Sequence, residues 1–332
     1  MRFGLFVPQG WRHDLVGIDP DRQWAVMRDF AAAADTGPWE SIWVYDHFHT
    51  VPRDVPSEEA THEAWTLMSA FAASTSRVRL GQMCTCMSYR NPAYLAKVAA
   101  TVDIISGGRT EMGIGAGWYE SEWKAYGYGF PRAGERLARL REGVEIMRQA
   151  WTTGTATLDG EHYQVENAVV RPLPLQDGGI PIWVAGGGEK VTLKIAAQYA
   201  DYTNFTGTPE VFTHKSELLR QHTLDVGTDF ERIVRSSNFN TVIAETEAEV
   251  QDRLGAIEAR VIPYLGTEVA ARFIAEYTGE LSDCVGTPEQ IIEKLTARRE
   301  LGLGYSIHYF PEAAYDRSGV ELFERTVVPA LS

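Results

Sequence analysis

The sequence predicts a single (β/α)8 barrel domain over residues 1–332. Apolar strand-like segments alternate with amphipathic helix-like segments along the whole chain, and eight strand-like segments can be counted. No change of composition and no linker divides this alternation. A doubly wound sheet followed by a second domain is the alternative, and the absence of a break favours the barrel.

The first half of the chain holds four strand-helix units. Each starts with a short apolar run and continues with apolar residues at helical spacing. Pro92 stands at an early position of the third helix, where its fixed backbone angle is tolerated. The predicted strands cover residues 3–8, 41–46, 77–87 and 109–117, and the helices cover residues 21–34, 63–74, 91–105 and 134–151.

The second half continues the alternation and adds two insertions. Strands are predicted at residues 180–186, 201–205, 233–243 and 304–310, with helices at 190–199 and 210–224. About 158–175 the pattern indicates a hairpin insertion, and about 260–282 it indicates an extra helical segment. Because long insertions commonly carry function, both are expected at the functional mouth of the barrel.

Composition excludes several function classes. The net charge of −14 and the pI of about 5.1 argue against nucleic acid as a partner, since its recognition begins with a basic surface. No apolar run is long enough to span a membrane, which takes roughly 18 to 20 residues. Only three cysteines occur, Cys84, Cys86 and Cys284, a number that suits a reducing compartment, so a cytoplasmic location is expected.

Three consecutive glycines separate the fifth strand from its helix. Gly186, Gly187 and Gly188 raise the entropy cost of ordering the chain, and they let backbone N–H groups approach an anion closely. Thr192 lies on the first turn of the helix, whose dipole favours negative charge there. The pattern indicates a phosphate-binding turn, although it lacks P-loop spacing, and a tight packing turn is the alternative.

Asp46 and His47 follow the second strand directly. A histidine held by a carboxylate in one tautomer can exchange a proton near neutral pH, which makes His47 a candidate general acid or base. A structural histidine is the alternative. A metal site that uses these two residues with His49 and His62 is not favoured, because the ligands do not fall at a recognised spacing.

Alternate glycines mark the fourth strand. Gly113, Gly115 and Gly117 differ from the dinucleotide GxGxxG pattern and are expected to leave room for a flat ring. In the third strand, Cys84 and Cys86 share one face and are interpreted as small apolar residues rather than a redox pair. Candidates to wall an aromatic or apolar substrate are Trp11, Trp65, Trp118 and Trp123.

Taken together, these landmarks resemble the luciferase-like monooxygenase superfamily, in its branch of oxidoreductases that use the deazaflavin coenzyme F420. The resemblance rests on the order and spacing of "FGLFVPQG", "ESIWVYDHF", the segment from Val78 to Trp123, "PIWVAGGGEKVTLKIAAQYAD" and "VGTPEQIIEKL". It implies a barrel mouth that holds the coenzyme, with its phosphate at the glycine turn. It also implies a non-prolyl cis peptide bond near Met83 and Cys84, and a proton-handling role for His47.

The resemblance further implies contacts with the coenzyme and the substrate. Coenzyme contacts are expected from Asp46, His47, Met83, Cys84, Thr85, Gly115, Ala116, Gly117, Gly186, Gly187, Gly188 and Thr192. Substrate contacts are expected from Gln9, Trp11, Trp118, Glu120 and Asn204.

Hydride transfer between C5 of the deazaflavin and a small organic substrate, apolar or aromatic, is the expected reaction, with His47 as the catalytic residue. A monooxygenase that uses reduced FMN and oxygen is one alternative, and a deazaflavin carrier without turnover is another. The sugar-phosphate dehydrogenases of the family place a catalytic glutamate where this chain has Trp118, so glucose 6-phosphate is not expected as substrate. Glu120 or Glu122 could supply a carboxylate, but a solvated surface role is expected for each. Relatives suggest a possible homodimer.

Overall fold

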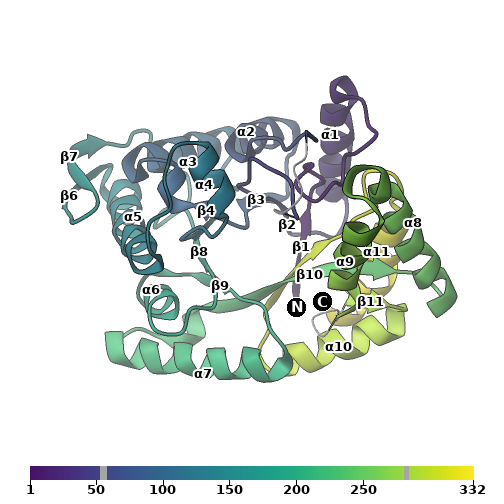
Figure 1. Cartoon of the computed structure of the whole chain (residues 1–332). Coiled ribbons are helices and arrows are strands. Elements are labelled where there is room, and N and C mark those ends of the chain that lie inside the picture. Colours follow the sequence, from purple (N-terminus) through teal and green to yellow (C-terminus); the bar gives the residue numbers. More distant parts are fainter. Residues whose placement is uncertain (53–57, 280–283) are drawn as a thin grey trace.

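A computed structural model describes residues 1–52, 58–279 and 284–332 of the chain. Figure 1 shows a ring of strands enclosed by helices. Within the described ranges the barrel strands are β1 (Arg2–Phe6), β2 (Ser41–Val44), β3 (Arg79–Gln82) continued by β4 (Thr85–Cys86), β5 (Met112–Gly115), β8 (Ile182–Ala185), β9 (Tyr202–Asn204), β10 (Val234–Ile243) and β12 (Tyr305–Tyr309). The predicted barrel is confirmed.

Parallel pairing closes the ring. The sheet order runs β3-β2-β1-β12-β10-β9-β8-β5-β4, and all of these neighbours pair in parallel. Since β3 and β4 are two halves of one strand, the path ends where it begins. A parallel bridge between Leu80 and Thr110 joins β3 to the segment before β5. Strand β11 (Cys284–Gly286) pairs in parallel with the carboxyl-terminal end of β10.

Helices cover the outside of the barrel, and those predicted between residues 21 and 224 lie close to their predicted bounds. They are α1 (Pro20–Thr36), α2 (Ala64–Ser74), α3 (Pro92–Ser106), α5 (Ala133–Thr153), α6 (Thr192–Tyr199), α7 (Pro209–Val226), α10 (Pro288–Glu300) and α11 (Ser318–Leu331). Helix α3 illustrates why the sequence sets these limits. The Asn91 side chain accepts from the amides of Ala93 and Tyr94, Pro92 occupies the first turn, and Gly107 ends the helix at φ 71°.

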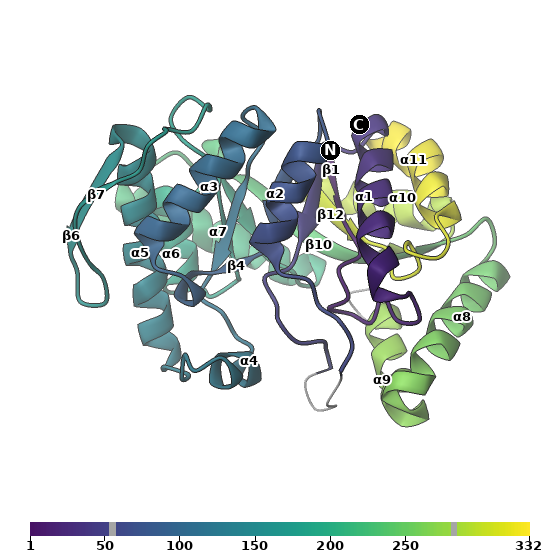
Figure 2. The ribbon, with the colours of Figure 1, turned by 90° about the horizontal axis from the view of Figure 1, so that it is seen from above.

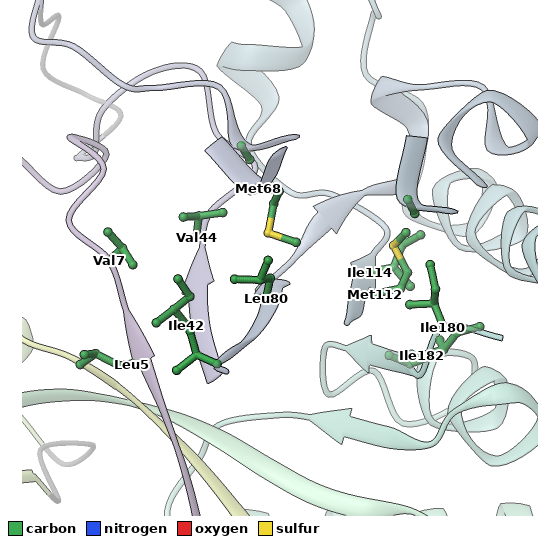
Figure 3. Close-up of a cluster of buried hydrophobic side chains, with 14 of the residues drawn as sticks. Leu5, Val7, Ile42, Val44, Met68, Leu80, Met112, Ile114, Ile180 and Ile182 are labelled. Atoms are coloured by element: carbon green, nitrogen blue, oxygen red, sulfur yellow. The ribbon is translucent and has the colours of Figure 1, made fainter. Parts of the chain in front are cut away.

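Two apolar cores lie on the two faces of the barrel sheet. Alternate strand residues such as Leu5, Ile42 and Leu80 face outward and pack under the helices, and Figure 3 shows Met68 of α2 pointing toward Val44 and Leu80. The residues between them face inward and include large aromatic side chains, among them Phe6, Trp43, Trp183, Tyr305 and Tyr309.

The inward-facing aromatic rings fill the barrel toward the end where its strands begin. A Cβ at Gly4 would lie 2.6 Å from Nε1 of Trp43, so this glycine gives the indole its space. Trp183 stacks on Tyr202 with ring centroids 3.9 Å apart and meets Tyr305 edge-on at 4.9 Å. The interior is therefore solid at this end, and a ligand must enter from the other.

The two insertions lie in different places. Helices α8 (Glu247–Leu265) and α9 (Thr267–Thr278) stand at the same end as α4 (Glu120–Ala125), opposite the chain termini (Figure 2). The antiparallel hairpin of β6 (Thr155–Asp159) and β7 (Gln164–Val169), which overlaps the insertion expected about 158–175, packs against α5 on the flank. The expectation that both insertions form the mouth is therefore wrong for the hairpin. Residues 280–282 of the second insertion lie outside the described residues.

Among the helices that the structure describes, none combines the length and apolar character needed to cross a lipid bilayer.

His308 is a buried titratable group on the outward face of β12, where the strands pack against the helices. Its ring nitrogens lie 2.9 Å from Thr241 Oγ1 and 2.9 Å from Ser306 Oγ, and burial lowers its pKa to about 3. Because the unfolded chain binds this proton near pH 6.5, protonation favours unfolding as pH falls from about 6.5 toward about 3.

We expect His308→Gln to make stability less sensitive to acid. Each proton taken up on unfolding contributes about 1.4 kcal/mol per pH unit to the slope of the unfolding free energy. Urea unfolding of both proteins between pH 4.5 and 7.5 gives the unfolding free energy as a function of pH. Well below pH 6.5 the slope of this curve should be steeper in the native protein by an amount that corresponds to close to one proton, and above pH 6.5 the two slopes should coincide. Parallel curves throughout the range would contradict the role of His308.

Candidate active site

A cavity of about 350 Å³ opens at the carboxyl ends of the barrel strands. Its wall combines the ends of β2, β5 and β8, the break between β3 and β4, and the first turn of α6. The glycine turn and His47 therefore face the same mouth. Predicted site residues on the wall are Trp11, Asp46, His47, Met83, Cys84, Gly115, Ala116, Gly117, Trp118, Gly186 and Thr192.

The break in the third barrel strand brings two predicted residues to the cavity. The peptide bond between Met83 and Cys84 is cis, as the resemblance implies, and both side chains line the wall. Thr85 does not. Its side chain is fully buried on the other face of the strand, where its hydroxyl donates to Gln82 Oε1 at 2.8 Å. The expected contact of Thr85 with the coenzyme is not supported.

Three expected substrate residues also lie outside the cavity wall. Gln9 is fully buried, and its amide exchanges hydrogen bonds with the backbone of Tyr45 and donates to His62 O. Asn204 is buried and donates to Ser236 Oγ and Asn238 Oδ1, both at 2.9 Å. Glu120 is exposed and pairs with Lys124 at 2.7 Å. Gln9 and Asn204 therefore position their neighbours, and Glu120 belongs to the surface.

His47 is held by a carboxylate, but not by that of Asp46. Its Nδ1 lies 2.9 Å from Glu122 Oε2, and the Glu122 side chain is fully buried. The expected surface role of Glu122 is thus wrong, because α4 turns this residue inward while Glu120 faces solvent. No described residue makes a hydrogen bond to His47 Nε2, and the ring lines the cavity.

Asp46 instead ties the end of β2 to the start of the segment after β4. Its buried carboxylate accepts from Arg90 Nη1 at 2.8 Å and Nη2 at 2.9 Å, and from the Cys86 amide at 2.9 Å. Arg90 also pairs with Glu63 at 2.7 Å. Bidentate charge pairing of this kind fixes geometry strongly, so Asp46 supports the cavity wall.

Aromatic rings surround His47. Trp11 stacks on the imidazole with centroids 4.2 Å apart and planes at 6°, and Trp118 and Tyr119 meet it edge-on at 5.7 and 5.6 Å. Of the four tryptophans considered as substrate walls, Trp11 and Trp118 line the cavity. Trp65 is buried in the core under the helices, and Trp123 is buried in a separate small cluster with Cys86 and Tyr89, so neither lines the cavity.

The alternate glycines of the fourth barrel strand make room mainly for protein atoms. A side chain at Gly113 would collide with the carbonyl of Gln82, one at Gly115 would lie 2.7 Å from Cys84 Sγ, and one at Gly117 would lie 2.5 Å from Cys86 Sγ. The expectation that this row serves a flat ring is therefore incomplete, because the thiols of the third strand occupy much of the space.

The thiols of Cys84 and Cys86 resist ionisation. Burial, and secondarily the charge of Asp46, raises the pKa of Cys84 to about 12 and that of Cys86 well above its usual value. Both sulfurs are therefore protonated at neutral pH and act as small apolar groups.

Cationic and hydroxyl groups surround the glycine turn. Gly186 has φ 114°, and a side chain at Gly187 would collide with the ammonium of Lys215 from α7. A Cβ at Gly188 would lie 2.7 Å from Thr192 Oγ1, and no described side chain caps the N-terminus of α6. Gly187 and Gly188 are not on the cavity wall, but they adjoin it through Gly186 and Thr192. The turn thus joins backbone amides, a helix N-terminus and a lysine in one place.

A second cavity of about 530 Å³ adjoins the first and shares Trp11, Tyr45 and Asn238 with it. Helix α9 and the end of β10 supply much of its wall. Arg12 lies in this wall, within 5.8 Å of the ring centroids of Trp11, Phe273, Tyr277 and Tyr309, and pairs with Glu276 at 3.0 Å. Asn238 is half-buried at the junction of the two cavities, and its Oδ1 accepts a hydrogen bond from Asn204 Nδ2 at 2.9 Å.

The sequence did not point to Arg90, Lys215, Asn238 or Tyr45, and it assigned Glu122 to the surface. Glu122, Arg90 and Lys215 carry their charges from helices or loops far along the chain, and Asn238 sits within a long strand. Tyr45 could have been found, because it directly precedes Asp46 at a strand end. Within the described ranges no group of three or more His, Cys, Asp or Glu is arranged to hold a metal ion.

A known protein family matches most of this chain. The family model described as "Luciferase-like monooxygenase" matches residues 1–304. The chain belongs to this family. The resemblance found in the sequence is thereby confirmed.

Named relatives include two kinds of enzyme. An F420-dependent glucose-6-phosphate dehydrogenase of Kineococcus radiotolerans is 38% identical over 176 residues, 53% of this chain and 50% of that protein. One from Nocardia farcinica is 27% identical over 91% of this chain and 93% of the relative. A pyrimidine monooxygenase RutA of Acinetobacter baylyi is 32% identical over 56% of this chain and 50% of the relative. The chain spans about half the length of the first of these dehydrogenases and of the monooxygenase.

Solved structures share the fold over the full chain. An F420-dependent secondary alcohol dehydrogenase in complex with an F420-acetone adduct has a TM-score of 0.78 at 20% identity, and covers 100% of this chain and 99% of its own. The monooxygenase RslO1 from Streptomyces bottropensis has a TM-score of 0.80 at 21% identity, with 100% coverage of both. At these identities the likeness establishes the luciferase-like barrel alone.

We expect Arg90→Ala to destabilise the protein by about 3–5 kcal/mol, because it leaves the buried Asp46 carboxylate without its charge partner. Urea unfolding at pH 7 measures the loss, and Arg90→Ala with Asp46→Asn should recover part of it. Arg28→Ala, which breaks an exposed pair with Asp29, is the control and should cost less than about 1 kcal/mol. Equal losses at Arg28 and Arg90 would contradict the role of the Asp46 pair.

Proposed function

We propose that this protein is an F420-dependent oxidoreductase that transfers a hydride between the deazaflavin and a small organic substrate. The observation that carries the proposal is the convergence of His47, the glycine turn and an apolar wall on one cavity. The relative from Nocardia farcinica, named for its F420 dependence, aligns over nearly the whole chain, which favours this coenzyme.

The residues present fit the coenzyme in two respects. The amides of the Gly186–Gly188 turn, the N-terminus of α6 and the Lys215 ammonium form a cradle suited to a phosphate group. Met83, Gly115 and Ala116 present small or apolar surface on which a flat ring can lie. When bound, the deazaflavin supplies the hydride-accepting or hydride-donating carbon, and the protein supplies orientation and a proton.

His47 is the residue we assign to proton exchange with the substrate. Its ring is fixed between the Trp11 face and the Glu122 carboxylate, so its free Nε2 has a defined direction. The rings of Trp11, Tyr45 and Tyr119 line the same cavity as His47. A positioned acid or base contributes roughly 10²–10⁴-fold to rate.

The second cavity is the proposed substrate site. It shares a wall with the first and combines rings of Phe6, Tyr45 and Tyr309 with polar groups of β10. A small substrate with an apolar or aromatic body fits this lining. Glucose 6-phosphate is not expected to react, since Trp118 stands where the sugar-phosphate dehydrogenases carry a glutamate. A protein that only carried the deazaflavin, without turnover, would not need this second cavity.

A flavin monooxygenase is the second candidate, favoured by the RutA relative and by the same phosphate cradle. Oxygen uptake with reduced FMN and a panel of small apolar and aromatic organic compounds separates the two. Uptake coupled to product would support the monooxygenase, whereas reduction or oxidation of F420 without uptake would support the oxidoreductase.

We expect F420 to bind at micromolar concentration in a spectral titration, and Lys215→Ala to weaken binding by about tenfold, because a phosphate loses its cation. Lys97→Ala removes an exposed lysine of α3 whose ammonium donates to the Arg171 carbonyl, and should leave binding unchanged. No spectral change with F420 at these concentrations would end the proposal. Equal effects of both lysine variants would show that the cradle is not the phosphate site.

A further inference from the structure

Glu122 collects four hydrogen bonds on one buried carboxylate. The backbone amides of Phe48 and His49 donate to Oε1 at 2.8 and 2.9 Å, while Oε2 lies 2.9 Å from His47 Nδ1 and 3.1 Å from the Tyr89 hydroxyl. The carboxylate comes from α4, after β5, and His47 comes from the loop after β2. One side chain therefore locks the backbone and the ring of the loop that carries the candidate catalytic residue.

The donors decide which nitrogen of His47 carries the proton. Backbone amides can only donate, so Oε1 is an acceptor. Burial raises the pKa of the Tyr89 hydroxyl, which therefore keeps its proton and can donate to Oε2. With Oε2 accepting, Nδ1 of His47 must be the protonated nitrogen.

We infer that Glu122 is a positioning residue that fixes His47 in the Nδ1-protonated tautomer and leaves Nε2 as the proton acceptor at the cavity. This role rests on the proposed function for its effect on rate. The tautomer itself is a property of the protein alone.

The isosteric change Glu122→Gln gives a test with a definite sign. The carbonyl oxygen of the new side-chain amide keeps the two backbone donors, and the amide NH₂ group takes the place of Oε2. That NH₂ group can only donate, so Nδ1 of His47 becomes an acceptor and the proton moves to Nε2. Tyr89 can rotate its hydroxyl to accept.

Long-range ¹H–¹⁵N spectra of the protein without coenzyme read the tautomer of His47, assigned by loss of its signals in His47→Asn. We expect Nδ1–H in the native protein and Nε2–H in Glu122→Gln. Tyr89→Phe removes the other donor to the same oxygen and should keep Nδ1–H. An Nε2–H signal in the native protein, or an unchanged tautomer in Glu122→Gln, would overturn the inference.

Kinetics provide the second readout, with Glu135→Gln as the charge control, because the Glu135 side chain in the first turn of α5 is 39% exposed and pairs with Arg139 away from the cavity. We expect kcat of Glu122→Gln to fall by roughly 10²–10⁴-fold with KM little changed, as for a base held in the wrong tautomer. Unchanged kcat alongside a switched tautomer would deny Glu122 its role in the reaction. If F420 does not bind any of these proteins, the proposed function fails, and the spectra still decide the tautomer.

Discussion

Parallel pairing around a closed ring is the constraint on which this molecule depends. Because every barrel strand runs the same way, the segments after β1, β2, β5, β8 and β10 all emerge at one end. The opposite end is filled by Trp43, Trp183 and Tyr305, which leaves the carboxyl ends as the place where a cavity can form. His47 and the glycine turn meet there although more than a hundred residues separate them in the sequence.

The sequence predicted what depends on local pattern. Strand and helix positions follow from the period of apolar residues, and Asp46, His47 and the Gly186–Gly188 turn follow from their place at strand ends. The partners of these groups could not be read in this way. Glu122 lies 75 residues from His47, and only the turn of α4 decides that it faces inward while Glu120 does not.

Side-chain direction explains the other errors. Thr85 alternates with Cys84 and Cys86 in the strand, so it points away from the cavity that the two cysteines reach. Gln9 and Asn204 stand at or near strand ends, but Gln9 is hydrogen-bonded to neighbouring backbone groups, and Asn204 to the Ser236 hydroxyl and the Asn238 amide. Polar residues near the mouth thus divide into those that face the cavity and those that hold the facing residues in place.

The two adjoining cavities draw on different stretches of the chain. Apart from Trp11 and Asn238, the smaller one is walled by residues between Tyr45 and Thr192, whereas most of the larger one is walled by residues between Thr206 and Tyr309. Substitutions in α9, or in β10 apart from Asn238, can therefore remodel the larger cavity while the smaller keeps its shape. Among the described residues, only Trp11, Tyr45 and Asn238 line both cavities, so a substitution at any of these three positions alters the walls of both.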